Sequence, residues 1–354
     1  MEYLDKLHET TVKFPMTDIW NDSCGFEDLK YAIERGAVGA TTNPMIVTAA
    51  LSSELGMWES TIKNLISDNP SDNEDDIAWK IIETIGQERA KMLLPIFEKS
   101  GGKKGRLSMQ TNIKNFRNAD RMAEQAKHFN TLGDNIQVKI PVTSAGVKAI
   151  EEATFAGVNI NATVSFTLSQ AIEVAEAVER GLNRRTAAGL SNDGMYPVCT
   201  LMLGRLDDYI VKCAKERGDA VSDEALKWSS IAVTKKAYKL FNERGYRTRL
   251  LTAAYRRVQH WSEFIGADMI MTIPHKWQVA IGESDVDVVA RIDNEVTKAI
   301  LDELGTLPEF MEAYEEGAQT CEDFDSYKLL HSVTVDFLAG YDEFVRIVRA
   351  FFFK

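Results

Sequence analysis

The chain has 354 residues, of which 45% are hydrophobic and 27% are charged, and its formal net charge at pH 7 is -12. This composition is typical of a folded globular protein and excludes a disordered, collagenous or membrane-spanning chain. The acidic excess argues against nucleic acid and anionic membrane surfaces as partners, because both attract clustered basic charge.

Short β-branched or apolar segments alternate along the chain with longer segments of helical periodicity. The predicted strands are Phe14–Trp20, Val38–Thr42, Arg106–Gln110, Gln137–Val142, Val158–Val164, Tyr196–Met202, Arg249–Ala254 and Met269–Ile273. The predicted helices between them include Phe26–Arg35, Asp120–Thr131, Ser144–Phe155, Leu168–Arg180, Leu203–Arg217 and Gln259–Ile265. Eight strands that are each followed by a helix predict a parallel sheet of the α/β class. We expect it to close into a (β/α)₈ TIM barrel rather than form an open doubly wound sheet.

Three regions exceed a minimal barrel. Glu54–Lys99 holds more helix than one crossover after the second strand needs, and Gly181–Gly194 is polar and flanked by glycine, which predicts a loop before the sixth strand. Residues 284–354 predict a helical C-terminal extension, with a break at Leu307-Pro308. We therefore expect one elaborated domain over residues 1–354, with the barrel at about 14–283.

The four cysteines lie far apart and form no C-x-x-C pair: Cys24, Cys199, Cys213 and Cys321. In a chain of this length that pattern predicts reduced thiols rather than a disulfide framework. The first residues also lack the basic-then-apolar pattern of a signal peptide. We therefore expect a cytoplasmic protein.

Polar residues recur in phase near the ends of several predicted strands, where barrel enzymes carry their chemistry. In Gln137–Pro141, Val138 and Ile140 have the parity that faces the helices, so Lys139 points into the barrel. The first strand ends in Asp22, which shares a face with Trp20. This concentration of inward polar side chains predicts a functional site at the barrel mouth.

A lysine enclosed in such a barrel has a direct chemical use. Desolvation lowers the pKa of the ammonium and frees the amine to attack a carbonyl, which gives a Schiff base. Aldol chemistry beside that Schiff base needs a group that moves protons, and Asp22 is the candidate, with Thr163 and Asn161 as hydrogen-bonding partners. The alternative is that Lys139 reaches the barrel rim and forms a structural ion pair.

Two motifs carry a family resemblance. Val138-Lys139-Ile140-Pro141-Val142-Thr143-Ser144-Ala145-Gly146, followed by Gly157-Val158-Asn159-Ile160-Asn161-Ala162-Thr163, resembles the Schiff-base segment of the transaldolase family. Gly39-Ala40-Thr41-Thr42-Asn43-Pro44 is similar to the second-strand signature of that family. The resemblance extends over roughly residues 14 to 280. It implies a (β/α)₈ barrel that forms a Schiff base with a ketose and needs no metal or organic cofactor.

The resemblance also implies roles for residues at matching positions. Lys139 corresponds to the Schiff-base lysine and Asp22 to the acid/base on the first strand. The residues that match those positioning substrate hydroxyls and the catalytic water are Thr41, Asn43, Asn161 and Thr163. The residues that match the binding site for the sugar phosphate are Thr200, Arg205 and Arg256, and a guanidinium suits a phosphate because it binds in a bidentate manner. The implied partners are small sugar phosphates.

One catalytic position departs from the transaldolase pattern. The third strand of a standard transaldolase ends in a glutamate, whereas this chain has Gln110, which cannot exchange a proton as a carboxylate does. Glutamine at this position resembles the fructose 6-phosphate aldolase branch of the same family. Asn161 and Arg256 favour the transaldolase branch, and Met202 matches the usual residue of neither branch.

Three functions therefore remain open from the sequence. The first is a transferase that moves a dihydroxyacetone unit from a ketose phosphate to an aldose phosphate, as in the pentose phosphate pathway. The second is a lyase that releases free dihydroxyacetone, and the third is a barrel that binds sugar phosphate without turnover. No histidine or cysteine spacing predicts a metal site, and no G-x-G-x-x-G follows a strand to predict a dinucleotide site. A homo-oligomer is left open.

Overall fold

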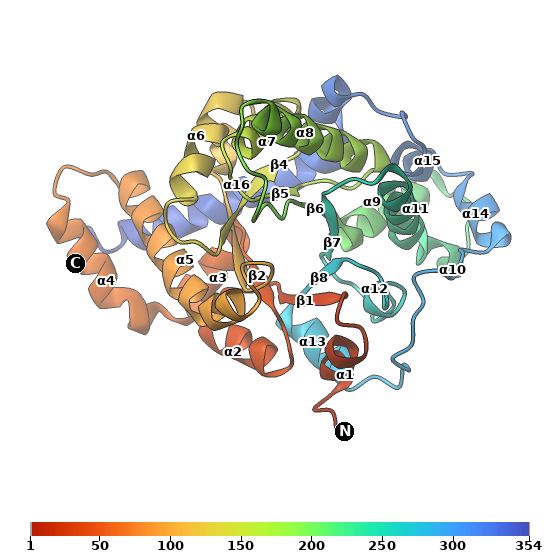
Figure 1. Cartoon of the computed structure of the whole chain (residues 1–354), viewed down its shortest axis with the longest axis horizontal. Coiled ribbons are helices and arrows are strands. Elements are labelled where there is room, and N and C mark those ends of the chain that lie inside the picture. Colours follow the sequence, from red (N-terminus) through yellow and green to blue (C-terminus); the bar gives the residue numbers. More distant parts are fainter. Residues whose placement is uncertain (1, 354) are drawn as a thin grey trace.

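A computed structural model describes residues 2–353 of the chain. Eight parallel strands close into a barrel in the order in which they occur along the chain (Figure 1). The strands are β1 (Asp18–Asn21), β2 (Gly39–Thr41), β3 (Arg106–Gln110), β4 (Ile136–Pro141), β5 (Ile160–Thr163), β6 (Val198–Met202), β7 (Arg249–Ala253) and β8 (Ile270–Ile273). The predicted TIM barrel is confirmed.

Helices alternate with the strands and surround them (Figure 1). The first half of the chain contributes α1 (Lys6–Lys13), α2 (Phe26–Glu34), α3 (Pro44–Ser53), α4 (Leu55–Asp68), α5 (Glu74–Lys99), η1 (Ile113–Asn115), α6 (Ala119–Phe129), α7 (Ser144–Phe155) and α8 (Leu168–Ala187). The second half contributes α9 (Leu203–Arg217), α10 (Asp223–Leu226), α11 (Ser229–Arg244), α12 (Gln259–Ser262), α13 (His275–Gly282), α14 (Lys298–Leu304), α15 (Pro308–Tyr314), η2 (Cys321–Ser326) and α16 (Lys328–Arg349). Within residues 2–353, no helix is both long and apolar enough to cross a bilayer.

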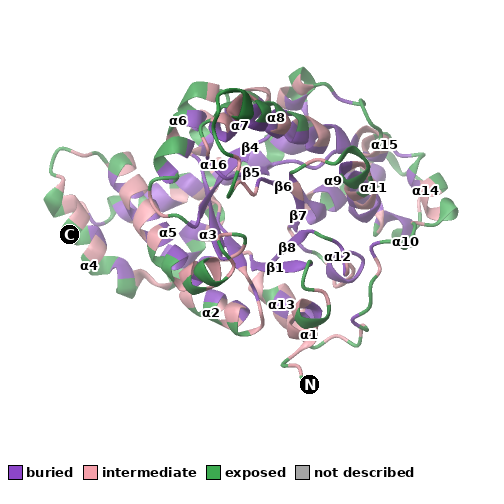
Figure 2. Ribbon diagram, in the orientation of Figure 1, coloured by how far each residue is buried: buried purple, intermediate pink, exposed green. Residues whose placement is uncertain are grey.

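The interior of the barrel divides into an apolar side and a polar side. Side chains from β1, β6, β7 and β8 pack together as an apolar cluster inside the ring: Trp20, Val198, Leu251, Ala253 and Ile270. Parallel partners in register point to the same side of a sheet, so Asn161, which pairs with Val198, also points inward. The strand residues are buried, except for the half-buried Arg249 at the start of β7 (Figure 2). The polar side therefore lies on β3, β4 and β5, where apolar packing does not fill the interior.

Close approach between strand and helix holds β4, the strand of Lys139, in place. Thr143 caps α7, because its side-chain oxygen accepts from the backbone N–H of Gly146 at 2.8 Å. A Cβ on Gly146 would lie 1.8 Å from the carbonyl oxygen of Pro141, so only glycine lets α7 begin this close to the strand. The turn that ends β4 is thus fixed by local chemistry.

The helices beyond a minimal barrel lie where the sequence predicted them. Three helices, α3, α4 and α5, follow β2, and α14, α15, η2 and α16 form the C-terminal region, with α15 beginning at Pro308. In Figure 1, α16 passes behind the strands toward α3 and α5. Thr48 Oγ1 on α3 donates to the carbonyl oxygen of Gly340 at 2.9 Å, and Tyr341 donates to Asp75 at 2.5 Å. These bonds join α16 to the helices that follow β2. The division of the chain into domains stays a prediction.

The predicted loop Gly181–Gly194 is wrong in its first half, because α8 continues to Ala187. Gly181 and Leu182 are buried, and Arg184 forms ion pairs with Glu151 and Glu152 of α7. The packing against α7 therefore overrides the polar composition. The remaining loop leads into the start of β6, so it lies at the opposite end of the barrel from the strand ends that carry the predicted site.

Two further element boundaries differ from the prediction by three residues or more. β1 begins at Asp18 rather than at Phe14, because the backbone N–H of Thr17 donates to the carbonyl oxygen of Phe14 in a turn. α12 ends at Ser262 rather than at Ile265, where the last residues form bonds between positions three apart instead of helical ones. Both changes shorten an element without moving a predicted site residue.

Candidate active site

Neighbouring strands bring most of the predicted polar residues to one end of the barrel. Lys139 on β4 pairs in register with Gln110 on β3 and with Asn161 on β5, so these three side chains project to the same side. Thr163 lies two residues beyond Asn161 on β5, and Thr200 lies two beyond Val198 on β6. The site therefore gathers around Lys139 on the polar side of the barrel interior.

Lys139 is enclosed, with only 5% of its surface exposed. Its Nζ donates to the backbone carbonyl oxygen of Thr42 at 3.1 Å. Burial lowers the pKa of Lys139 from 10.5 to about 8, and the charge of Asp22 opposes this shift. At pH 7 about one Lys139 in ten is then the free amine, against roughly one in 3,000 for an unperturbed lysine. Burial therefore raises the population of the nucleophilic amine, and the enclosed Lys139 does not lie at the solvent-exposed rim, where the sequence left open an ion pair.

Asp22 follows β1 directly, and its backbone N–H donates to the carbonyl oxygen of Ile273 at 3.1 Å. The Thr41 hydroxyl donates to Asp22 Oδ1 at 2.7 Å and lies 2.7 Å from the Thr272 hydroxyl. Burial raises the pKa of Asp22, while Lys139 and the Thr41 bond act in the opposite direction. A carboxyl group whose pKa is raised is a stronger base, which suits it to accept a proton and return it during a reaction.

The side chain of Gln110 has an unusual environment. It is 5% exposed, and neither Nε2 nor Oε1 has a hydrogen-bond partner within residues 2–353. A buried polar group without a partner costs about 1–3 kcal/mol, so such groups mark places where a ligand or water binds. Because Gln110 pairs in register with Lys139, the two side chains project to the same side of the sheet from neighbouring strands.

A chain of hydrogen bonds connects the polar residues of β3, β5 and β6. Asn161 Nδ2 donates to Ser108 Oγ at 3.1 Å, and Thr200 Oγ1 donates to Asn161 Oδ1 at 2.7 Å. Thr163 is also buried, at 1% exposed. Asn43 differs from these residues, because its Oδ1 accepts from the backbone N–H of Ile46 at 2.9 Å and caps α3. The structure thus gives Asn43 a structural bond, and its role toward substrate stays a prediction.

Two backbone conformations at the strand ends are strained. Val164, directly after β5, has φ 56°, and Ala254, directly after β7, has φ 62°. A side chain with a Cβ rarely adopts this left-handed region, and a β-branched residue such as valine does so least. Strain of this kind concentrates at functional sites, where the surrounding fold imposes it. Both positions lie at the end of the barrel that carries Lys139.

The two arginines predicted to hold phosphate both have carboxylate partners. Arg205, in the first turn of α9, donates from Nη1 to Asp336 Oδ2 on α16 at 2.8 Å. Arg256, beyond β7, contacts Asp208 on α9 through Nε at 3.0 Å and through Nη2 at 2.9 Å. A Cβ on Gly204 would lie 2.5 Å from Arg256 Cγ, so the arginine packs directly over this glycine. The arginines thus meet at the start of α9.

Sequence reasoning missed several of these contacts. Thr272 was not singled out, although it is the one polar residue in Ile270–Ile273 and has the same parity as Ile270. Asp336 lies 131 positions from Arg205, and nothing in the local pattern of α16 indicates the pair. Such long-range partners become visible only when the helices are placed in space.

A family model described as Transaldolase/Fructose-6-phosphate aldolase matches residues 19–319, which include almost all of the barrel strands and the C-terminal helices α14 and α15, but not η2 or α16. The chain belongs to this family. Among its curated relatives is Transaldolase 1 of Streptomyces avermitilis, 28% identical over 247 residues, which cover 69% of this chain and 64% of the relative. Transaldolase 1 of Streptomyces coelicolor is 32% identical over 50% of this chain and 46% of its own length. The transaldolase of Thiobacillus denitrificans is 28% identical over 71% of this chain and 76% of its own length.

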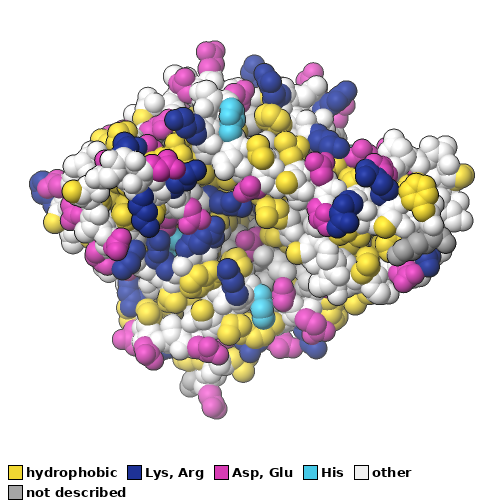
Figure 3. Space-filling view, turned by 180° about the vertical axis from the view of Figure 1, so that it is seen from behind, with side chains coloured by type: hydrophobic (Ala, Val, Ile, Leu, Met, Phe, Trp, Pro, Cys, Tyr) yellow, Lys and Arg dark blue, Asp and Glu magenta, His cyan; other side chains and the backbone are white. Residues whose placement is uncertain are grey.

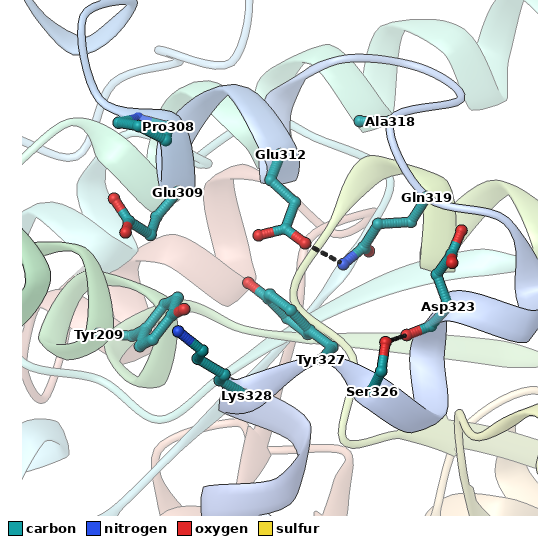
Figure 4. Close-up of a pocket in the computed structure, with 10 residues that line it drawn as sticks. All are labelled: Tyr209, Pro308, Glu309, Glu312, Ala318, Gln319, Asp323, Ser326, Tyr327 and Lys328. Carbon is teal, nitrogen blue, oxygen red and sulfur yellow. Dashed lines mark hydrogen bonds between the residues drawn. The ribbon is translucent and has the colours of Figure 1, made fainter.

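A pocket of about 430 Å³ lies away from the predicted site residues, between α9, α15, η2 and the first turn of α16 (Figure 4). Glu312 accepts a hydrogen bond from Gln319 Nε2 at 3.0 Å there, and Tyr327 lies beneath Glu312 in the figure. The hydroxyl of Tyr327 has no partner within residues 2–353. The pocket shows that the contact between α9 and the start of α16 is not completely packed.

Proposed function

We propose that the chain is a transaldolase-type transferase that moves a dihydroxyacetone unit from a ketose phosphate to an aldose phosphate. The observation that carries the proposal is the enclosed Lys139, because burial lowers the pKa of its amine to about 8. Asp22, directly after β1, is close enough for its charge to act on this amine. Family membership and curated relatives named transaldolase support the same reaction.

In the proposed reaction the neutral amine of Lys139 attacks the C2 carbonyl of the ketose. The carbinolamine loses water, with Asp22 supplying and removing protons, and gives an iminium on Nζ. Asp22 then takes the proton of the C4 hydroxyl as the C3–C4 bond breaks, and the electron pair of that bond moves toward the iminium nitrogen. The aldose phosphate leaves, and the three-carbon unit stays on Lys139 as the enamine.

The enamine then adds to the aldehyde carbon of an acceptor aldose phosphate. The aldehyde oxygen becomes a hydroxyl by taking back the proton that Asp22 accepted during cleavage. Hydrolysis of the imine frees the product ketose and restores the amine of Lys139. Gln110 orients water or a substrate hydroxyl, a role that its buried amide can take because it has no hydrogen-bond partner among residues 2–353. The proposed substrate contacts are the hydroxyls and amides already arranged around Lys139: Thr41, Asn43, Asn161, Thr163 and Thr200. Arg205 and Arg256 flank the proposed phosphate site.

Gln110 also favours a second candidate, a lyase that hydrolyses the three-carbon unit to free dihydroxyacetone. The test is to supply fructose 6-phosphate with and without an aldose phosphate and to measure both products. Dependence of ketose consumption on the added aldose supports the transferase. Rapid release of dihydroxyacetone without acceptor overturns it in favour of the lyase.

We place the reaction in the cytoplasm. The thiols of all four cysteines are free, as expected in a reducing compartment: Cys24, Cys199, Cys213 and Cys321. Fractionation of the source cells, followed by detection of the chain with an antibody, tests this location.

A further inference from the structure

The ion pair between Arg205 and Asp336 joins the proposed phosphate site to the C-terminal helix. Asp336 lies in the middle of α16, and Arg205 lies in the first turn of α9. Their 2.8 Å contact uses only Nη1 of the guanidinium. The edge formed by Nε and Nη2 has no partner within residues 2–353, and this edge is one of the two forks with which arginine binds an oxyanion.

Arg256 contrasts with Arg205 in this respect. Its Nε and Nη2 both contact Asp208, and its Nη1 donates to the carbonyl oxygens of Ala254 at 3.3 Å and Tyr255 at 3.2 Å. Every nitrogen of Arg256 therefore has a partner. Arg205 is the arginine that can hold an anion while keeping the partner that orients it.

The pocket beside Arg205 carries charges of both signs, with a small basic excess. It has a volume of about 320 Å³ and lies between α9 and α16. Its cations are Arg205, Lys212 and Lys328, and its carboxylates are Asp208, which Arg256 contacts, and Glu216, which lies 3.8 Å from Lys212. Figure 4 shows Lys328 of α16 beside Tyr209 of α9 at one end of this contact. On the face turned away from the viewer of Figure 1, basic and acidic side chains are interleaved rather than separated (Figure 3). The pocket thus gains its positive charge from particular residues and not from a uniformly basic face.

α16 is held at several points, so it can act as a fixed support for Arg205. Before the helix, Asp325 of η2 accepts from the backbone N–H of Ser144 at 2.9 Å, directly after the turn that ends β4. Beyond Asp336, Gly340 and Tyr341 bond to α3 and α5 as described above. Through these contacts α16 and η2 connect the pocket beside Arg205 with the turn that follows β4, the strand of Lys139.

We propose that Asp336 is a positioning residue. It holds Arg205 so that the Nε–Nη2 edge faces the anionic end of the substrate, and α16 thereby sets the preference for phosphorylated over uncharged sugars. The proposal rests on the proposed function, because it takes a sugar phosphate as the substrate. The side chains of the pair are 25% and 40% exposed, so the pair itself contributes little to stability and its removal leaves the fold intact.

The test compares Asp336→Ala and Asp336→Asn with the wild-type chain. Asp342→Asn is the matched control, because Asp342 is exposed on the same helix. One readout is the steady-state KM and kcat for fructose 6-phosphate, and a second is borohydride trapping of dihydroxyacetone, which has no phosphate. A third is calorimetric titration with inorganic phosphate, which needs no turnover.

We expect Asp336→Ala to raise KM for fructose 6-phosphate and to weaken phosphate binding about fivefold, with kcat and dihydroxyacetone trapping unchanged. We expect Asp336→Asn to restore most of the affinity for phosphate, because the amide oxygen of the asparagine still accepts a hydrogen bond from Arg205 Nη1. The proposal is overturned if Asp336→Ala leaves phosphate binding unchanged or strengthens it, since Asp336 is then irrelevant or a competitor for Arg205. An equal effect on both substrates overturns it as well, because that indicates a structural role. If the wild-type chain traps neither substrate, the proposed function fails, and phosphate titration still decides the role of Asp336.

Discussion

The lowered pKa of Lys139 has a measurable effect on stability that does not depend on any substrate. In the folded chain this pKa is about 8, against 10.5 when the lysine is solvated. Between these two values the unfolded chain keeps a proton that the folded chain has lost, so the free energy of unfolding rises with pH in this window. A difference of 2.5 pKa units corresponds to about 3 kcal/mol over the whole window.

Lys139→Met removes this titration and keeps an unbranched side chain of similar length. We therefore expect the free energy of unfolding of the wild-type chain to rise by about 3 kcal/mol relative to the variant between pH 7 and pH 11. Burial raises the pKa of Asp22 and the charge of Lys139 opposes this shift, so removing the lysine also changes the titration of Asp22 and adds to the difference at the acidic end of the window. The other titrating groups cancel in the difference.

The assay is equilibrium urea unfolding of both chains at intervals of half a pH unit, followed by fluorescence. Lys148→Met is the control, because Lys148 is exposed on α7 and its ammonium remains hydrated on folding. The control is expected to give a difference that does not vary in the same window. A difference between wild type and Lys139→Met that stays flat from pH 7 to pH 11 would refute the reasoning, because it means that the amine is not desolvated.

Three further substitutions test the site and its supports. Gly204→Ala places a Cβ 2.1 Å from the carbonyl oxygen of Ala254, so we expect kcat/KM for fructose 6-phosphate to fall at least about tenfold. Gly56→Ala on α4 is the control, because its added Cβ meets open space and kcat/KM is expected to stay unchanged. Ala254→Gly relieves a φ of 62°, and urea unfolding is expected to show a gain of about 1 kcal/mol; a loss contradicts the assignment of strain. Gln110→Met removes a buried amide without a partner, and we expect a gain of about 1 kcal/mol in the free energy of unfolding together with a lower kcat; full activity means that the amide orients nothing.

Much of the fold follows from sequence periodicity alone. The alternation Val138-Lys139-Ile140 places the lysine inward because a strand has a period of two, and the structure confirms that Val138 and Ile140 lie in the core outside the barrel ring. The end of α8 could not be predicted in this way. Its polar last turns are stabilised by α7, through the ion pairs of Arg184, and a partner in another helix leaves no trace in the local pattern.

The residues of the site also divide into those that could be predicted from local periodicity and those that depend on tertiary contacts. Lys139, Gln110 and Asn161 could be placed together because they share a parity on consecutive strands. The partners of the arginines could not be predicted, since Asp336 comes from a helix whose path over the barrel depends on tertiary contacts. The amide of Gln110 has no hydrogen-bond partner among residues 2–353, and this could not be predicted either. The sequence shows that a glutamine ends the strand, but not whether a neighbouring side chain contacts it.

The proposal that Lys139 forms a Schiff base is tested most directly by trapping the chain with borohydride in the presence of fructose 6-phosphate and mapping the modified peptide by mass spectrometry. We expect a stable adduct on Lys139, and a three-carbon mass shows that the C3–C4 bond has been cleaved. Lys139→Ala should show no adduct, while the exposed Lys148 stays unmodified in both chains. An adduct on Lys139 with another ketose but not with fructose 6-phosphate means that the proposed substrate is wrong and that the proposed mechanism stands. No adduct on Lys139 with any ketose contradicts the account.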